Sequence, residues 1–357
     1  MKDIKIMYIA NFTLEPYFSF CIKKAFASIN VIPKLICVNY DEYVNHLTDL
    51  QDTYCILICL SFEYLFPNTI IDVISGETTQ NGIVDEALQK CKSLYDTIKL
   101  HSNSPVFWVG FEDYSFYRSK VGNVLSIVNC IIENVNLFLY TYLDKEDTFI
   151  DFKRLIADIG IDNAISYKNK YRWNSPYSKI ILSRLSNEIV KCYLAKQGLS
   201  KKCLVLDCDN VLWGGILSED GIEGVKLGNV GTGRLYQDFQ RFLLSLYYHG
   251  VILTVCSKND ESDVLKMFRE HSGMVLGEKH ISYFCCSWDN KVDGIKSIAE
   301  SLGIGLDSIA FIDDSIFEIE GVKAIVPEVV SIQFTRDTIF NSISCFNLKA
   351  PPHNPPS

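Results

Sequence analysis

Apolar and polar positions alternate in blocks along the first half of the chain. Short apolar runs predict strands at residues 4–10, 34–38, 54–60, 106–109 and 136–140. Longer amphipathic segments predict helices at residues 16–28, 82–100 and 117–133. Because strands and helices alternate, the pattern predicts an α/β fold with a parallel sheet that carries helices on its faces.

The second half repeats this pattern in a second potential domain. Apolar runs at 203–206, 251–255 and 309–312 predict strands buried on both faces, and a long helical pattern at 176–196 precedes them. A chain of 357 residues is long enough for two cores. We therefore expect two α/β domains, at residues 1–175 and 176–345, with the boundary near residues 173–176. The proline-rich stretch 346–357 cannot hold a helix or a central strand, and we expect a disordered tail there.

Composition excludes several classes of partner. The formal net charge of -9 argues against a protein that binds nucleic acid or a membrane surface, because such binding needs clustered cations. No apolar stretch approaches the ~20 residues that span a bilayer. The 13 cysteines are scattered through apolar segments, without the paired spacing of zinc sites and without a preceding signal peptide. We expect reduced thiols and a cytoplasmic protein.

Four polar side chains with complementary chemistry lie in short motif segments of the second half. Asp207 comes directly after strand 203–206, at the strand end where open α/β sheets bind ligands, and its carboxylate could attack phosphorus. Asp209 could protonate the departing oxygen and then deprotonate a water. Ser257 could donate its hydroxyl to a phosphate oxygen, and Lys291 could neutralise the phosphate and the nucleophile.

Each of these residues alone is often a helix cap, a turn residue or a solvated charge. Their order along the chain, each beside a buried strand, favours a phosphoryl-transfer site. Lys296 is the rival for the lysine role, but the spacing after Trp288 favours Lys291.

A metal site is predicted beside these residues. Asp313 and Asp314 follow strand 309–312. Mg²⁺ prefers octahedral oxygen ligands and keeps several waters. Asp207, Asp313 and Asp209, the last through its backbone carbonyl, make a plausible protein share of that shell. We expect Asp314 to belong to the same metal-binding group and to orient the shell or Lys291.

The motif residues together resemble the four ordered motifs of the haloacid dehalogenase (HAD) superfamily. The segments LDCDNVLWGGILSEDG, CSKND and FIDDSIFEIEGVKAIVPEV are similar to the FkbH-like branch, subfamily IIIC, over about residues 170–335. IANFTLEPYFSF near the N-terminus and YRWNSPYSKI extend the resemblance upstream. Val211 departs from many relatives, which have threonine there, but the superfamily admits either residue.

The resemblance implies a HAD-like Rossmannoid domain with a minimal cap, preceded by a flavodoxin-like or SGNH-hydrolase-like domain. A hydrolase of that kind needs Gly-Asp-Ser after the first strand and an Asp-x-x-His pair. Here Asn11, Phe12 and Thr13 follow the strand, and His46 and His101 lack such a pair. We therefore expect a scaffold without a triad, acting either as a packing unit or as a docking surface for a carrier protein. Thr13 as a nucleophile is the less favoured alternative.

The size of the cap segment indicates which substrates the site can accept. Between Asp207 and Ser257 we expect only a glycine-rich loop or hairpin, at residues 214–233, before a helix at 235–248. A small cap leaves the site open, which favours a bulky or protein-bound substrate. Trp213 could wall the entrance, or it could be a buried packing residue.

The resemblance also implies a reaction. FkbH-like proteins are associated with taking glyceryl from 1,3-bisphosphoglycerate and passing it as a thioester to an acyl carrier protein. Cys208 and Cys256 are candidate thiolates for such a transfer. Each can equally be a small buried apolar residue, and strand alternation points Cys208 away from the site. Two alternatives remain, a simple Mg²⁺-dependent phosphatase that uses water and a non-catalytic carrier-docking protein.

Overall fold

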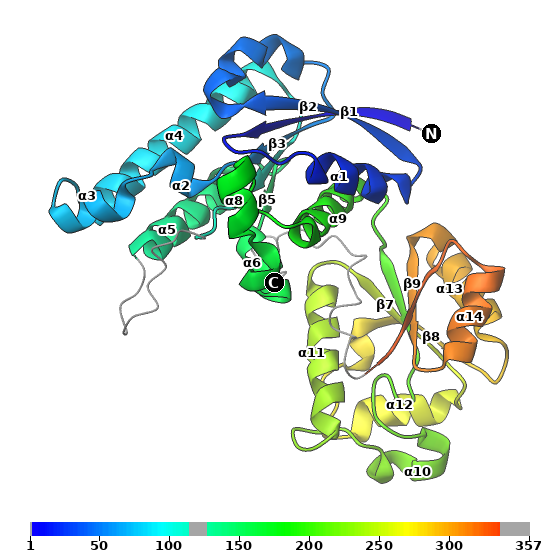
Figure 1. Cartoon of the computed structure of the whole chain (residues 1–357). Coiled ribbons are helices and arrows are strands. Elements are labelled where there is room, and N and C mark those ends of the chain that lie inside the picture. Colours follow the sequence, from blue (N-terminus) through cyan, green and yellow to red (C-terminus); the bar gives the residue numbers. More distant parts are fainter. Residues whose placement is uncertain (1, 114–126, 336–357) are drawn as a thin grey trace. The chain divides into compact units, whose positions relative to one another are not determined.

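The chain forms two compact units, residues 1–192 and 193–357 (Figure 1). The computed structural model describes residues 2–113 and 127–335. Each unit contains a five-stranded sheet, which confirms the predicted two-domain α/β fold. The division falls after Cys192, further along the chain than the predicted boundary, so α9 (Lys179–Lys196) lies mostly in the first unit. The predicted tail at 346–357 lies outside the described residues.

The first unit is built on a parallel sheet with the order β2-β1-β3-β4-β5. Its strands are β1 (Lys2–Ala10), β2 (Val31–Asn39), β3 (Cys55–Cys59), β4 (Val106–Val109) and β5 (Thr148–Ile150). Every residue of β3 and β4 is buried, as expected for central strands that are covered on both faces. The first four predicted strands are thus confirmed to within a few residues.

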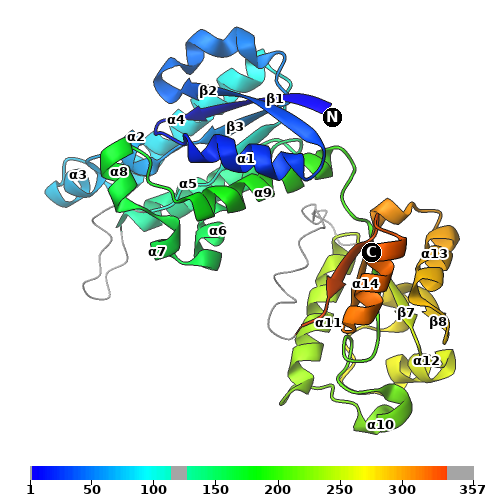
Figure 2. The ribbon, with the colours of Figure 1, turned by 45° about the vertical axis from the view of Figure 1, so that its right-hand side comes forward.

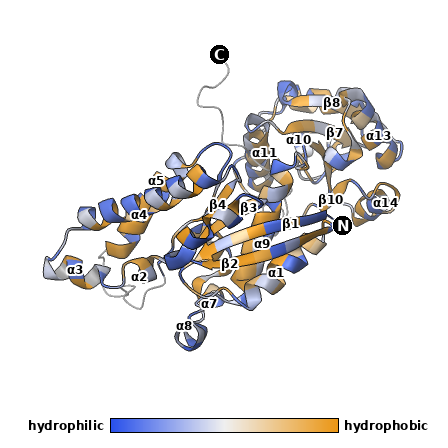
Figure 3. Cartoon of the chain, turned by 90° about the horizontal axis from the view of Figure 1, so that it is seen from above, coloured by the Kyte–Doolittle hydropathy of each residue, from blue (hydrophilic) through white to orange (hydrophobic). Residues whose placement is uncertain are grey.

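Helices cover this sheet. They are α1 (Tyr17–Ala27), the 3-10 helix η1 (Tyr40–Leu50), α2 (Phe62–Leu65), α3 (Thr69–Ser75), α4 (Gln80–His101), α5 (Ile127–Tyr142), α6 (Phe152–Ile159), α7 (Ile161–Ala164), α8 (Tyr167–Trp173) and α9. The buried faces of α4 and α5 pack against the apolar side chains of β1, β3 and β4. Figure 3 shows hydrophobic and hydrophilic residues mixed along these two helices, as expected for amphipathic helices that cover a sheet.

The predicted strand at 136–140 is wrong, because these residues lie in α5. The buried positions of α5 follow a spacing of three and four residues, which is the period of a helix face: Val128, Ile131, Ile132, Val135 and Leu139. Leu137 and Tyr140 are exposed, so the apolar run does not form a continuous buried strand. The actual fifth strand, β5, is only three residues long. Of the helix predicted at 117–133, residues 127–133 are confirmed within α5, and residues 117–126 lie outside the described residues.

The second unit contains a parallel sheet with the order β10-β9-β6-β7-β8. Its strands are β6 (Cys203–Leu206), β7 (Ile252–Ser257), β8 (Ile281–Cys286), β9 (Ile309–Asp313) and β10 (Val330–Gln333). In the centre of the sheet, Val205 of β6 pairs with Thr254 of β7 and with Phe311 of β9. The three strands predicted in this half are confirmed.

Alternate residues of β6 face opposite helix layers. Leu204 and Leu206 pack with residues of α11 (Gly233–Tyr248) and α12 (Glu261–Glu270), whereas Cys203 and Val205 pack with α13 (Lys291–Leu302) and α14 (Ile316–Ile325). Figure 2 shows α13 and α14 together on one side of this sheet. Short 3-10 helices, η2 (Glu278–His280) and η3 (Leu306–Ser308), complete the unit. Burial on both faces explains why β6 reads as an unbroken apolar run.

The segment between β6 and α11 holds more than the predicted loop or hairpin. It contains the short helix α10 (Leu217–Gly224), and an antiparallel bridge between Gly214 and Lys226 closes its base. A kink at Gly221, where φ is 68°, interrupts α10, and this left-handed conformation favours glycine. The predicted helix at 235–248 is confirmed as α11. Among the residues that the structure describes, we find no helix with the length and apolar character that crossing a membrane requires.

Candidate active site

The carboxyl ends of three neighbouring strands bring the motif residues of the second unit together. Asp207 follows β6, Ser257 is the last residue of β7, and Asp313 is the last residue of β9. Since β9, β6 and β7 are adjacent and parallel, these side chains meet at one edge of the sheet. Lys291 is the first residue of α13 and reaches the same edge. All four residues are buried.

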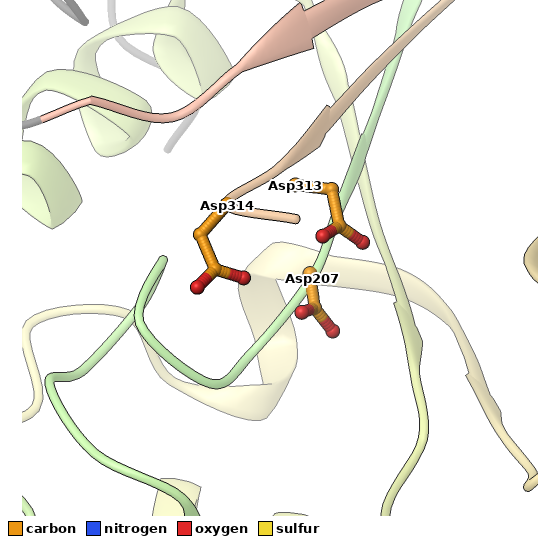
Figure 4. Close-up of side chains that lie close together, drawn as sticks. All are labelled: Asp207, Asp313 and Asp314. Carbon is orange, nitrogen blue, oxygen red and sulfur yellow. The ribbon is translucent and has the colours of Figure 1, made fainter. Parts of the chain in front are cut away.

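Three carboxylates form the acidic centre of this edge. Asp207, Asp313 and Asp314 each offer an oxygen atom, and these atoms lie within 4.8 Å of one another. Figure 4 shows the three side chains gathered where β6 and β9 end. The structure therefore brings together three of the four aspartates that the sequence assigns to a metal site.

Lys291 supplies a positive charge inside this acidic group. Its Nζ donates to Asp207 Oδ1 at 2.6 Å and to the carbonyl oxygen of Cys256 at 2.7 Å, and it lies 3.2 Å from Asp313 Oδ2. Burial alone would lower the pKa of Lys291, but the charges of Asp207 and Asp313 outweigh burial and raise this pKa above its ordinary value. The ammonium therefore stays protonated. The rival Lys296 is exposed on the same helix.

The remaining negative charge of the group is poorly compensated. Burial, and next the charge of Asp207, raises the pKa of Asp313 to about 6, and the same two causes raise the pKa of Asp314. Asp313 Oδ1 accepts the Ser315 amide at 2.9 Å. Its Oδ2 is buried and, among the described residues, accepts no hydrogen bond of regular geometry, although it is ion-paired with Lys291. A set of three buried or half-buried carboxylates with a single ammonium between them carries excess negative charge, which fits a hard divalent cation.

Asp209 lies outside this carboxylate group. Its Oδ1 accepts the indole N–H of Trp213 at 2.9 Å and the amide N–H of Leu217 at 3.1 Å, and its Oδ2 accepts Asn259 Nδ2 at 3.0 Å. These three hydrogen bonds fix the orientation of the Asp209 carboxylate. Its oxygens point toward N–H donors and not toward the carboxylate of Asp313. Because its side-chain oxygens accept these N–H groups, Asp209 could contact a metal only through its backbone carbonyl. This contact, predicted from the sequence, stays a prediction.

Trp213 does not wall the entrance of the site. Its side chain is completely buried and packs edge-on against Phe268, with 6.4 Å between the ring centroids. The packing alternative is therefore the right one, and the hydrogen bond from Trp213 Nε1 to Asp209 adds a positioning contact that the sequence does not reveal.

Two asparagines in the motif segments were missed by the sequence argument. Asn259 is buried, and its Nδ2 lies 3.0 Å from both Asp209 Oδ2 and Ser257 Oγ. Asn210 has a left-handed backbone, with φ of 55°, and its side chain accepts the Gly215 amide and hydrogen-bonds Asp314. The available signal was an amide beside each motif in DCDN and CSKND, since asparagine tolerates left-handed backbone and hydrogen-bonds nearby groups.

The candidate cysteines lie in surroundings that disfavour a thiolate. Cys208 is fully buried, and burial together with the charge of Asp207 raises its pKa well above the ordinary value. The pKa of Cys256 is also raised, by its hydrogen bond with Cys285 and by burial. Reactive cysteines sit in exposed, electropositive places, and buried ones are inert. The geometry therefore gives no support to an acyl role for Cys208 or Cys256.

Comparison with known proteins supports the fold. No protein-family model matches the chain, and no curated protein matches it in sequence. The N-terminal part of a Bacteroides fragilis protein, which contains a phosphatase domain and was solved with Mg, is 22% identical with a TM-score of 0.84, over 98% of this chain and 95% of that chain. The two proteins therefore share the two-unit α/β fold.

Two further solved structures match only part of the chain. A HAD family enzyme from Bacteroides thetaiotaomicron is 12% identical with a TM-score of 0.28, over 40% of this chain and 97% of that chain. The 3-deoxy-D-manno-octulosonate 8-phosphate phosphatase of Moraxella catarrhalis is 22% identical with a TM-score of 0.25, over 36% of this chain and 66% of that chain.

Proposed function

We propose that this protein is a Mg²⁺-dependent phosphoryl-transfer enzyme of the HAD superfamily that acts on a phosphorylated substrate. The observation that carries the proposal is the pairing of buried Lys291 with buried Asp207 at 2.6 Å, beside the carboxylates of Asp313 and Asp314. A nucleophile, a fixed cation and a cation-binding carboxylate pair at the end of one sheet are the parts that phosphoryl transfer needs.

The side chains divide the chemistry between them. In the first step, an oxygen of Asp207 forms a bond to phosphorus while the bond to the leaving oxygen breaks, and Asp209 gives its proton to that oxygen. In the second step, Asp209 removes a proton from a water that attacks the aspartyl phosphate, which releases phosphate and regenerates Asp207. Ser257 and Lys291 hold the phosphoryl oxygens by a hydroxyl hydrogen bond and a positive charge.

Magnesium fits the acidic group. Asp207, Asp313, Asp314 and the backbone carbonyl of Asp209 would hold it, and the observation that favours a cation there is the gathering of three carboxylates whose oxygens lie within 4.8 Å of one another. When bound, Mg²⁺ would offset the repulsion between the carboxylates and the phosphate. The magnesium in the Bacteroides fragilis structure, which shares this fold, supports the same choice of ion.

The finer proposal is an FkbH-like activity, in which glyceryl from 1,3-bisphosphoglycerate is loaded on an acyl carrier protein. The sequence segments that resemble FkbH-like proteins support it. In that transfer, a thiol attacks the acyl carbon, the C–O bond to the phosphate breaks, and the thiol proton passes to the departing phosphate, so that a thioester and hydrogen phosphate are formed. Because Cys208 and Cys256 are buried and their pKa values are raised, the attacking thiol is better supplied by the carrier than by this chain.

A simple phosphatase is the second candidate. The specific observation in its favour is that the Asp207 carboxylate lies at the end of β6 beside Lys291, an arrangement that supports attack at phosphorus with water as the final acceptor. The third candidate, a carrier-docking protein without activity, is the least favoured, because Asp207, Ser257, Lys291 and Asp313 all converge at one edge.

For the first unit we propose an SGNH-hydrolase-like scaffold without a triad. Asn11 follows β1, and its side chain hydrogen-bonds the backbone of Ser61. Its Oδ1 accepts the Ser61 amide at 2.7 Å, and its Nδ2 donates to the Ser61 carbonyl at 3.0 Å. His101 is the last residue of α4 and hydrogen-bonds the carbonyl of Thr97. These contacts favour structural roles, and docking of a carrier remains the functional alternative for this unit.

One incubation separates the three candidates. Purified protein is mixed with Mg²⁺, 1,3-bisphosphoglycerate and a phosphopantetheinylated carrier protein, and both intact masses and released phosphate are measured. A glyceryl mass on either protein supports transfer, phosphate release without it supports the phosphatase, and neither product supports the docking protein. The Asp207→Asn variant and a carrier without phosphopantetheine are the controls.

A further inference from the structure

We infer that Asn259 is a positioning residue that holds Asp209 and Ser257 in fixed relation to each other, so that proton delivery and phosphate binding act on the same phosphoryl group. The inference rests on the proposed function. Asn259 lies in the loop between β7 and α12, two residues after Ser257, and only 3% of it is exposed.

The amide of Asn259 joins two strand ends. Its Nδ2 carries two hydrogens, and it has one acceptor for each, Asp209 Oδ2 and Ser257 Oγ, both at 3.0 Å. Asp209 belongs to the loop after β6, and Ser257 ends the neighbouring strand β7. A single planar group therefore sets the separation between the proposed proton donor and the proposed phosphate-binding hydroxyl.

These contacts also set the direction of the serine hydroxyl. Because Ser257 Oγ accepts a hydrogen bond from Asn259, its own hydrogen can be donated, either to the Cys208 sulfur, with which Ser257 hydrogen-bonds here, or to a stronger acceptor such as a phosphoryl oxygen. The other oxygen of Asp209 is fixed by Trp213 Nε1 and the Leu217 amide. Asn259 thus completes the arrangement of donors around Asp209.

A second buried amide in the same unit shows what a structural role looks like. Gln240 is fully buried and hydrogen-bonds the Leu212 carbonyl and the amides of Val275 and Leu276, with a further contact to the sulfur of Met274. Its partners are backbone groups and a thioether. Both partners of Asn259 are side chains of the proposed reaction, and this contrast assigns Asn259 to the chemistry and not to the fold.

Loss of the amide should matter most when the leaving group needs a proton. In the first step the phosphorus–oxygen bond breaks, and an alkoxide leaving group takes the proton of Asp209. The carboxylate that leaves from an acyl phosphate needs no proton. A displaced Asp209 should therefore slow the cleavage of alkyl phosphates far more than that of acyl phosphates.

The test compares two substrates in the full-length protein with Mg²⁺. For Asn259→Ala we expect kcat/KM to fall about 10- to 100-fold more for glycerol 3-phosphate than for acetyl phosphate, with the greater loss in kcat. Asn259→Leu keeps a similar shape without a donor or a new charge, and it should show the same bias if the alanine variant folds poorly. Gln240→Leu is the matched control and should lower both rates by one common factor. Equal losses for both substrates in the Asn259 variants would overturn the inference.

A binding measurement separates this inference from the proposed function. If the wild-type protein releases phosphate from neither substrate and also leaves 1,3-bisphosphoglycerate unchanged, the proposed function fails, and calorimetry with Mg²⁺ and trifluoroberyllate decides the inference. We then expect Asn259→Ala to bind trifluoroberyllate at least about 10-fold more weakly than wild type, with unchanged affinity for Mg²⁺ alone. Equal trifluoroberyllate affinities, or no binding by the wild type, would overturn the inference.

Discussion

Lys291 Nζ donates to Asp207 Oδ1 at 2.6 Å, although 84 positions separate the two residues in the sequence. Both side chains are buried, and the carboxylate of Asp313 lies 3.2 Å from the same ammonium. Removing one partner of a buried ion pair strongly destabilises the folded protein, because the other charge is left buried without compensation. The pair therefore links the stability of the second unit to its proposed chemistry.

Replacement of Lys291 by methionine should cost about 3–5 kcal/mol of stability and should abolish turnover. The variant leaves three carboxylates close together without their cation, so Mg²⁺ should raise its melting temperature more than that of the wild type. Thermal melts with and without Mg²⁺ measure this. Lys296→Met, at an exposed position of the same helix, is the control and should behave like the wild type. A Lys291→Met protein with wild-type stability and activity would contradict the assignment.

Asp207→Asn should remove turnover and leave the fold intact. The amide keeps the shape of the side chain but lacks the nucleophilic charge, and Lys291 keeps Asp313 as a partner. Phosphate release and circular dichroism are the measurements. Asp263→Asn, at an exposed position in the first turn of α12, serves as the control for a neutralised aspartate. Turnover by Asp207→Asn would refute the aspartyl-phosphate route.

Asp209→Asn should slow both proton-transfer steps, with a loss of about 10²- to 10⁴-fold for an alkyl phosphate. With acetyl phosphate the first step needs no proton, so the variant should accumulate phosphorylated protein because the base that activates water is missing. Intact-protein mass spectrometry after rapid quenching detects this species. If Asp209→Asn hydrolyses alkyl phosphates at the wild-type rate, Asp209 is not the acid and base.

Stability should depend on pH and Mg²⁺ together. The pKa of Asp313 is raised to about 6 from its ordinary value of 3.8, so the folded protein binds this proton more tightly than the unfolded chain. Without Mg²⁺, the contribution of Asp313 to stability therefore improves as the pH falls from above 6 towards 4, and the raised pKa of Asp314 acts in the same direction. Mg²⁺ competes with these protons.

The increase in melting temperature caused by Mg²⁺ should accordingly be larger at pH 7.5 than at pH 5. Melts in Mg²⁺ and in chelator at both pH values measure the difference, and Asp313→Asn should remove most of it. An increase that is the same at both pH values would show that the ion does not bind at Asp313.

The sequence predicts the strands best where both faces are buried. Strands β4 and β6 are unbroken apolar runs and were placed to the residue, because helices cover both sides of the sheet. Residues 136–140 form a similar run, and a short apolar segment of a helix cannot be told from a strand by periodicity alone. Strand β5 is too short to show any period.

The site residues likewise fall into two groups, those that the sequence predicts and those whose roles depend on the fold. Asp207 and Asp313 were found because each follows a buried strand, and such positions meet at one sheet edge whatever the details of the fold. The bridge made by Asn259 depends on β6 and β7 being neighbours, which the sequence does not state. The burial of Trp213 likewise depends on α12, which brings Phe268 against its ring.

The most direct test of the account is a crystal structure of the protein with Mg²⁺ and trifluoroberyllate, a mimic of the transferred phosphoryl group. We predict that the beryllium is bonded to an oxygen of Asp207, that the ion lies between Asp207 and Asp313, and that Lys291 contacts a fluorine. A mimic bound away from Asp207, or an ion held by other residues, would contradict the central claim that this sheet edge transfers phosphoryl groups.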